Sequence, residues 1–226
     1  MPNSLTSPPV RPLLDRLFRA ADADDTRRVT IGERHPDGAA VSARDKADAY
    51  AELYIPVSPE GGRLLYTLVR ASRPATVVEF GTSFGISTIY LAAAVTDNGT
   101  GRVVSTELSA KKIAAAEANL REAGVGAVVT VLEGDARETL GGLPGPVGLV
   151  LLDGWKDLCL PVLRLLEPVL APGALVAADD SSLASMSDYL GYVRNPAGGY
   201  VTVSFPVEDG MEISCWASPA HREVSS

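Results

Sequence analysis

Residues 76–91 read TVVEFGTSFGISTIYL, a short apolar strand that runs through a glycine turn into a helix. Gly81 permits a sharp turn at the end of the strand, and Gly85 lets the helix pack closely against it. Backbone N–H groups in such a turn can come close to a nucleotide-like ligand. The stretch therefore predicts the first unit of an open α/β fold, with a ligand site at the carboxyl end of its strand.

The same alternation of strand and helix continues through the rest of the chain. Apolar runs at 76–80, 102–106, 127–132, 147–152 and 174–178 alternate with helical stretches at 86–95, 109–123, 136–141 and 156–170. Near-continuous apolar strands separated by helices predict a parallel sheet that is covered on both faces. After a helix at 185–194, two β-rich runs at 200–205 and 211–217 flank Glu208-Asp209-Gly210 and predict an antiparallel hairpin at the sheet edge.

The first 53 residues follow a less regular pattern. Apolar residues at helical spacing predict a helix over about 11–22, and the charged segment 23–41 predicts a loop that could act as a lid. Further helices are expected from Ser42 to Leu53 and from Pro59 onward. We therefore divide the chain into an N-terminal extension of residues 1–53, a main domain of residues 54–218 and a tail of residues 219–226.

Composition argues against several classes of partner. The 226 residues carry 20 Lys and Arg against 28 Asp and Glu without a basic cluster, so a nucleic-acid partner is not expected. No apolar run reaches the roughly 20 residues that span a bilayer, and the N-terminus lacks a signal-peptide pattern. Cys159 and Cys215 are expected to be buried reduced thiols, and His35 and His221 lie in polar segments that do not suggest catalysis. These features predict a cytoplasmic protein with no membrane partner.

Polar residues follow the first three predicted strands, which would all end at one edge of the sheet. Ser83 and Ser87 could bond a ligand carboxylate or the free N–H groups of the helix that begins there. Glu107 is placed to accept hydrogen bonds from both hydroxyls of a ribose, and Asp135 to accept one from an adenine amine. Either acid could instead cap the helix that follows it.

The spacing of the glycines separates two classes of cofactor. A dinucleotide fold favours G-x-G-x-x-G, whose middle glycine lets a pyrophosphate approach the backbone. The E-x-G-x-x-x-G stretch from Glu79 to Gly85 has a serine in that middle position and suits a nucleoside with an amino-acid tail. S-Adenosylmethionine is such a ligand.

The fourth and fifth predicted strands end in acidic residues. LVLLDGWKD at 149–157 carries Asp153, and LVAADDSS at 175–182 carries Asp179 and Asp180. Three carboxylates at adjacent strand ends repel one another unless a cation lies between them, and oxygen ligands suit a hard ion such as Mg²⁺. The alternative is that these residues cap helices or pair with arginine.

Two further residues of the 149–157 stretch could face the same site. Lys156 follows Asp153 by three residues, and a lysine partly removed from water beside a cation can accept a proton. An exposed helical lysine is the alternative. Trp155 could form a wall of the cofactor or acceptor pocket, or it could belong to the core.

Together these motifs resemble the cation-dependent O-methyltransferases, a family that includes the catechol and caffeoyl-CoA enzymes. The resemblance extends from Tyr54 to Trp216 and is strongest in LDxWKD at 152–157. ExGxxxGxS at 79–87, GDA at 134–136 and the acidic pair at 179–180 add to it. It implies an α/β, Rossmann-like, seven-stranded class I methyltransferase fold that ends in an antiparallel hairpin.

The resemblance also implies roles for individual residues. The S-adenosylmethionine site would be lined by Val57, Gly81, Ser87, Glu107 and Ala136, to which we add Glu79, Ser83, Asp135, Asp153 and Trp155. Asp153, Asp179 and Asp180 would hold Mg²⁺ or another divalent cation, and Lys156 would be the general base. The acceptor would be a phenolic or vicinal-hydroxyl small molecule of secondary metabolism, bound by a homodimer whose N-terminal extension forms the acceptor lid or the dimer contacts.

Two departures from the family pattern bear on the acceptor and the metal. The third metal ligand of the family is usually Asn, where this chain has Asp180. The acidic residue with which mammalian catechol enzymes hold the second hydroxyl aligns near Val203, which argues against a simple catechol as the natural acceptor.

Three other functions compete with this interpretation. A metal-independent methyltransferase would have the same motifs but would not need the carboxylate cluster to bind a cation. A nucleotide-dependent reductase would need the missing middle glycine and a Tyr/Lys pair. A non-catalytic S-adenosylmethionine-binding protein would not be expected to retain both Asp153 and Lys156.

Overall fold

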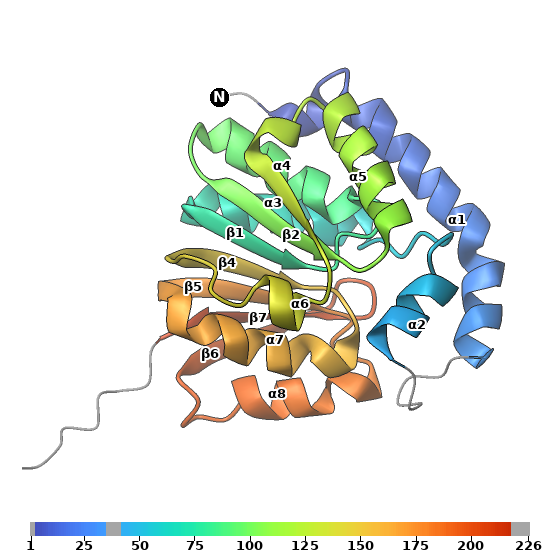
Figure 1. Cartoon of the computed structure of the whole chain (residues 1–226). Coiled ribbons are helices and arrows are strands. Elements are labelled where there is room, and N and C mark those ends of the chain that lie inside the picture. Colours follow the sequence, from blue (N-terminus) through green and yellow to red (C-terminus); the bar gives the residue numbers. More distant parts are fainter. Residues whose placement is uncertain (1–2, 35–41, 218–226) are drawn as a thin grey trace, which may run out of the picture.

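A computed structural model describes residues 3–34 and 42–217 of the chain (Figure 1). Its first long element, α1 (Val10–Arg34), begins where expected but continues far beyond residue 22. The predicted loop over 23–41 is therefore wrong as far as Arg34, because the helix continues without the regular apolar spacing on which that prediction relied. Residues 35–41, His35 and His221 lie outside the described residues.

Seven strands form one sheet in the order β3-β2-β1-β4-β5-β7-β6. The parallel strands are β1 (Thr76–Phe80), β2 (Arg102–Glu107), β3 (Val129–Glu133), β4 (Val147–Leu152) and β5 (Leu170–Asp179). The hairpin of β6 (Tyr200–Phe205) and β7 (Met211–Trp216) adds to this sheet through antiparallel pairing of β7 with β5. The predicted mixed sheet with a terminal hairpin is confirmed.

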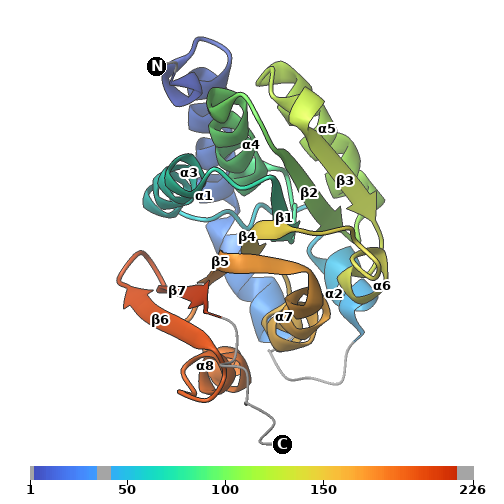
Figure 2. The ribbon, with the colours of Figure 1, turned by 90° about the vertical axis from the view of Figure 1, so that its left-hand side faces the viewer.

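Helices cover both faces of the sheet (Figure 2). On one face lie α1, α3 (Pro59–Ser72), α4 (Ile86–Asn98) and α5 (Ala110–Glu122); on the other lie α6 (Ala136–Thr139), α7 (Cys159–Leu166) and α8 (Ser187–Val193). Single 3₁₀ turns occur at Ser4–Thr6, Gly126–Val128, Lys156–Leu158, Glu167–Val169 and Ala184–Met186. The short helix α2 (Ala43–Ala49) ends four residues before the predicted end at Leu53.

Alternation along the strands divides the interior into two cores. In β1, Val77 packs into the core beneath α3 and α4, whereas Val78 and Phe80 pack into the core beneath α7. Cys159 is buried in the second core, but Cys215 is only half-buried and corrects the expectation that both thiols are enclosed. Among the described residues, we find no helix with the length and apolar character that a membrane span requires.

The order of the strands sets the place of the functional site. From β1 the chain proceeds outward to β2 and β3, then returns to the other side of β1 for β4 and β5. Ligands of open α/β sheets bind beyond the carboxyl ends of the strands at such a reversal. The reversal between β1 and β4 brings the glycine turn, Asp153 and the 179–180 pair to one edge.

Candidate active site

A cleft of about 290 Å³ opens at the carboxyl edge of the sheet. One end is lined by the glycine turn after β1 together with Glu107, Asp135 and Ala136, and the other by Asp153, Trp155, Lys156 and Asp180. Aromatic rings wall the cleft: Tyr54 stacks on Phe84 with ring centroids 4.0 Å apart, and Tyr50 meets Trp155 edge-on at 5.6 Å. Trp155 thus lines the cleft and also packs against the core beneath α7.

The glycine turn requires its glycines for two different reasons. Gly81 has φ +103°, and a Cβ there would lie 2.8 Å from the carbonyl oxygen of Asp153, so β1 and β4 could not approach as they do. Gly85 has φ +85°, and a Cβ there would lie 3.3 Å from Cβ of Ala116 in α5. The close contact predicted for Gly85 is therefore with a neighbouring helix and not with its own strand.

Two residues predicted to bind the cofactor do not line the cleft. Val57 is 1% exposed, packs in the core beneath α3 and α4, and is not among the residues that line the cleft. Glu79 is completely buried beneath the glycine turn, where Ser87, Thr88 and Ser105 donate hydrogen bonds to its carboxylate. Glu79 therefore holds the first turn of α4 in place behind the binding surface.

Burial raises the pKa of Glu79 to about 7, although the three hydroxyl donors oppose the shift. The folded protein then keeps the proton in a pH range where the unfolded chain, with a pKa near 4.5, has released it. The contribution of Glu79 to stability is full below pH 4.5 and is lost as the pH rises through 7. We expect the wild type to lose stability relative to Glu79→Gln over this range, as measured by denaturant unfolding in EDTA. Parallel pH curves for the two proteins would contradict the assignment.

Glu107 lines the cleft at the end of β2 and already accepts three hydrogen bonds from the backbone. The N–H of Ser83 donates to Oε2 at 2.8 Å, and those of Leu108 and Ser109 donate to Oε1 at 2.9 Å. Ser83 adopts a left-handed conformation, with φ +48°. The glycine turn and the end of β2 are thus joined through one carboxylate that also faces the cleft.

Asp135 has the capping role that the sequence offered as one alternative, and it also lines the cleft. It caps α6 by accepting a hydrogen bond from the N–H of Arg137 at 2.9 Å, and it pairs with the guanidinium of the same residue. These contacts hold the pKa of the Asp135 carboxyl below its usual range. Asp135 and the buried Ala136 nevertheless line the cleft, as predicted.

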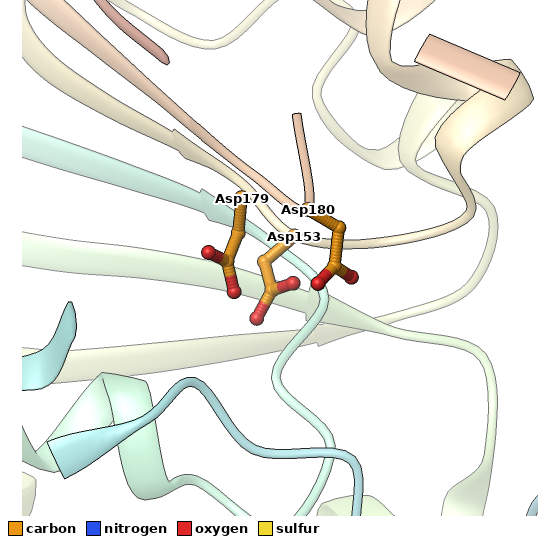
Figure 3. Close-up of side chains that lie close together, drawn as sticks. All are labelled: Asp153, Asp179 and Asp180. Carbon is orange, nitrogen blue, oxygen red and sulfur yellow. The ribbon is translucent and has the colours of Figure 1, made fainter. Parts of the chain in front are cut away.

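The three aspartates lie together as predicted (Figure 3). Each can offer a carboxylate oxygen such that all three atoms lie within 4.8 Å of one another. Burial and mutual repulsion raise the pKa of Asp153 to about 6 and that of Asp179 to about 8. The three carboxylates repel one another, and a bound cation would offset this repulsion. Their oxygen atoms are the ligands that hard divalent cations prefer.

Lys156 lies against this cluster at the start of the 3₁₀ turn after β4. Its Nζ is 3.0 Å from Oδ1 of Asp153 and 2.9 Å from Oδ2 of Asp180, and its side chain is only 10% exposed. Burial lowers the pKa of Lys156, but the two carboxylates outweigh burial and raise it. Lys156 is therefore a cation within the site and not an exposed helical lysine.

The β6–β7 hairpin contributes to the same end of the cleft, which sequence reasoning missed. The N–H groups of Ser181 and Ser182 donate to the carbonyls of Gly210 and Asp209, both at 2.9 Å, and so tie the Asp180 loop to the hairpin turn. Within that turn, burial and the charge of Asp180 raise the pKa of Glu208, which Ser58 hydrogen-bonds. The antiparallel topology could have revealed this, because the turn before β7 must lie beside the end of β5.

The position of Val203 shows that the alignment of this residue with the hydroxyl-binding acid of the mammalian enzymes is wrong. Val203 lies on the edge strand β6 with 54% of its surface exposed and does not line the cleft. Glu208 is the acidic residue that the hairpin brings toward the cluster, since its charge acts on both Asp153 and Asp180. The argument against a simple catechol that was drawn from Val203 therefore no longer applies.

Known proteins are similar to this chain in sequence and in fold. The family model for a methyltransferase domain matches residues 78–181. The chain is 30% identical to catechol O-methyltransferase B of Danio rerio, in an alignment that covers 77% of this chain and 70% of that enzyme. It is 34% identical to catechol O-methyltransferase of Mycobacterium tuberculosis over 66% of each chain, just under two thirds. The crystal structure of cofactor-bound Rv0187 from MTB aligns with a TM-score of 0.67 and 27% identity, covering 86% of this chain and 97% of that one.

Proposed function

The chain belongs to the catechol O-methyltransferase family of S-adenosylmethionine-dependent O-methyltransferases, and we propose that it methylates a hydroxyl of a small phenolic or vicinal-hydroxyl molecule with the help of a divalent cation. The observation that carries this proposal is the position of Lys156 against two of the three clustered carboxylates, at one end of an aromatic cleft. Asp153, Asp179 and Asp180 would hold the cation. When bound, the cation would make an acceptor hydroxyl more acidic.

Two groups of residues would divide the work of the reaction. When bound, S-adenosylmethionine supplies a methyl group on a sulfonium, which an oxygen nucleophile can displace directly. Glu107 and the glycine turn would fix the nucleoside, while Asp135 and Ala136 would form the far end of its site. Lys156, once it has released its own proton to solvent, would take the proton of the acceptor hydroxyl. Alignment of the two reactants in one cleft supplies much of the rate, because the step needs no covalent enzyme intermediate.

The acceptor would bind at the aromatic end of the cleft. Tyr50 and Trp155 offer flat apolar surfaces next to Lys156 and Asp180, as a phenolic ring requires. Glu208 supplies an additional carboxylate near Asp180 that could accept a hydrogen bond from a second hydroxyl. Ala47 of α2 also lines the cleft, which supports an acceptor role for part of the N-terminal extension.

The test is methyl transfer from labelled S-adenosylmethionine to a panel of ortho-dihydroxy phenolics, with Mg²⁺ and with EDTA. We expect labelled product that disappears on chelation and returns when Mg²⁺ is added back. No product with any acceptor, together with no binding of S-adenosylhomocysteine by calorimetry, would overturn the proposal.

The ion pairs of Lys156 favour a second candidate, methyl transfer without a metal. The ammonium already contacts two of the three carboxylates and could neutralise them without another cation. In that case product would persist in EDTA, and Asp153→Asn would remain active. Lys156 would then act as a charge that orients the acceptor.

The role of Glu107 is tested by Glu107→Gln. An amide keeps the shape of the side chain but loses the charge that strengthens hydrogen bonds from hydroxyl donors. We expect the Kd for S-adenosylhomocysteine to rise about tenfold or more, because a hydrogen bond to a charged group contributes about 1.5–3 kcal/mol. Turnover at saturating cofactor should fall far less. An unchanged Kd in calorimetry would remove Glu107 from the ribose role.

A further inference from the structure

Lys112 is a buried cation at the cofactor end of the cleft that the proposed mechanism does not use. It lies in the first turn of α5, is 5% exposed and lines the cleft. Its Nζ donates a hydrogen bond to Oγ of Ser83 at 3.2 Å and lies 5.5 Å from the ring centroid of Phe84. Burial lowers the pKa of Lys112, and the charge of Glu107 opposes this shift. The ammonium is thus held beside the glycine turn.

The contacts of Lys112 do not satisfy its ammonium. An ammonium has three N–H donors, and within the described part of the chain only Ser83 accepts from it, while no carboxylate forms an ion pair with it. A buried charge with so few partners is unfavourable unless a ligand completes its hydrogen bonds. Because Lys112 lines the cleft, a ligand in the cleft can supply the missing acceptors.

The position of Glu107 indicates which ligand group this is. Ser83 joins the two side chains, since its N–H donates to Glu107 at 2.8 Å and its hydroxyl accepts from Lys112 at 3.2 Å. A carboxylate can only accept hydrogen bonds and an ammonium can only donate them, whereas a hydroxyl does both. A sugar hydroxyl that donates to Glu107 retains lone pairs for Lys112. A carboxylate or phosphate at this position would instead be repelled by Glu107.

We propose that Lys112 donates a hydrogen bond to a ribose hydroxyl of S-adenosylmethionine whose proton is accepted by Glu107, so that the two residues bind the ribose as a donor–acceptor pair. This inference rests on the proposed methyl donor. The proposal makes Lys112, in the first turn of α5, a second cofactor-binding residue beside Glu107 at the end of β2.

The test combines a change in the protein with a change in the ligand. The Kd values of S-adenosylhomocysteine and of its 2′-deoxy and 3′-deoxy analogues are measured by calorimetry for the wild type and for Lys112→Met. Lys111→Met is the matched control, because Lys111 is the neighbouring lysine of α5 and its side chain is 59% exposed. Ser83→Ala tests whether Lys112 acts only by holding the turn.

We expect Lys112→Met to raise the Kd of S-adenosylhomocysteine about tenfold or more. The same substitution should raise the Kd of one of the two deoxy analogues by less than about threefold, because that analogue already lacks the hydroxyl that Lys112 would contact. Lys111→Met should leave all three Kd values unchanged, and Ser83→Ala should raise the Kd of S-adenosylhomocysteine less than Lys112→Met does.

Equal losses against all three ligands, or an effect fully reproduced by Ser83→Ala, would show that Lys112 only supports the turn. A loss that vanishes for 5′-methylthioadenosine, which lacks the amino-acid tail, would place Lys112 at the tail and overturn the ribose assignment. Failure of the proposed function is recognised separately, because the wild type would then not bind S-adenosylhomocysteine.

Discussion

Replacing Lys156 with methionine is expected to lower kcat by about 10²–10⁴-fold, the usual contribution of a general base. The Kd for S-adenosylhomocysteine should change less than about threefold, because the side chain contacts the carboxylate cluster and not the glycine turn. Single-turnover rates and calorimetric Kd values measure the two effects. Equal losses of turnover and affinity would contradict the role of Lys156 as the base.

Lys156→Arg separates the base from a purely electrostatic role. Arginine keeps a positive charge beside Asp153 and Asp180 but does not release its proton at any working pH. We therefore expect Lys156→Arg to be nearly as inactive as Lys156→Met. Wild-type turnover should increase toward alkaline pH, because the paired carboxylates raise the pKa of Lys156 and a base must first lose its proton. An active Lys156→Arg enzyme would leave Lys156 with a charge role alone.

Asp153→Asn is expected to remove the response of the protein to Mg²⁺. Binding of a cation to the folded state alone raises the free energy of unfolding by about 2.7 kcal/mol at a hundredfold excess over Kd. The wild type should therefore melt at a higher temperature when Mg²⁺ is added, and Asp153→Asn should not. Its kcat/KM with Mg²⁺ should fall about a hundredfold or more, because a neutral amide binds the cation more weakly and the acceptor hydroxyl then stays less acidic.

The pH dependence of the Mg²⁺ effect gives an independent check. The pKa of Asp153 is raised to about 6 and that of Asp179 to about 8, so at low pH protons compete with the cation. The Mg²⁺-dependent rise in melting temperature should grow from pH 5 to pH 8. Without the cation, these two acids should make the protein less stable as the pH rises, since acids with raised pKa values lose their stabilising contribution on deprotonation. Asp188→Asn, at an exposed acid of α8, should behave as the wild type in both experiments.

The parts of the site that sequence predicts well are those governed by strand ends. Asp153, Asp179 and Lys156 could be placed together because parallel strands deliver their carboxyl ends to one edge. Residues whose side chains extend away from a strand end were harder to place. The side chain of Glu79 lies beneath the glycine turn. Lys112 lies in the first turn of α5, and its side chain extends toward the N-terminus of that helix, as helical side chains do, and so contacts Ser83.

Contacts between distant segments account for the remaining differences. Glu208 belongs to a turn that sequence identifies easily, yet its neighbour Asp180 is 28 positions earlier in the chain. The continuation of α1 to Arg34 is not revealed by apolar periodicity, because residues 23–34 lack a regular apolar spacing. A homodimer and a place in secondary metabolism stay predictions of the family resemblance.

The pairing order of the hairpin has a consequence for the order of events during synthesis. β7 follows β6 in the chain but lies between β6 and β5 in the sheet. While a ribosome is still making β7, the edge of β5 is open and the loop of Asp180 lacks its backbone bonds to Asp209 and Gly210. The acidic end of the cleft can therefore be completed only after the hairpin has been made, because the Asp180 loop is tied to residues 209 and 210.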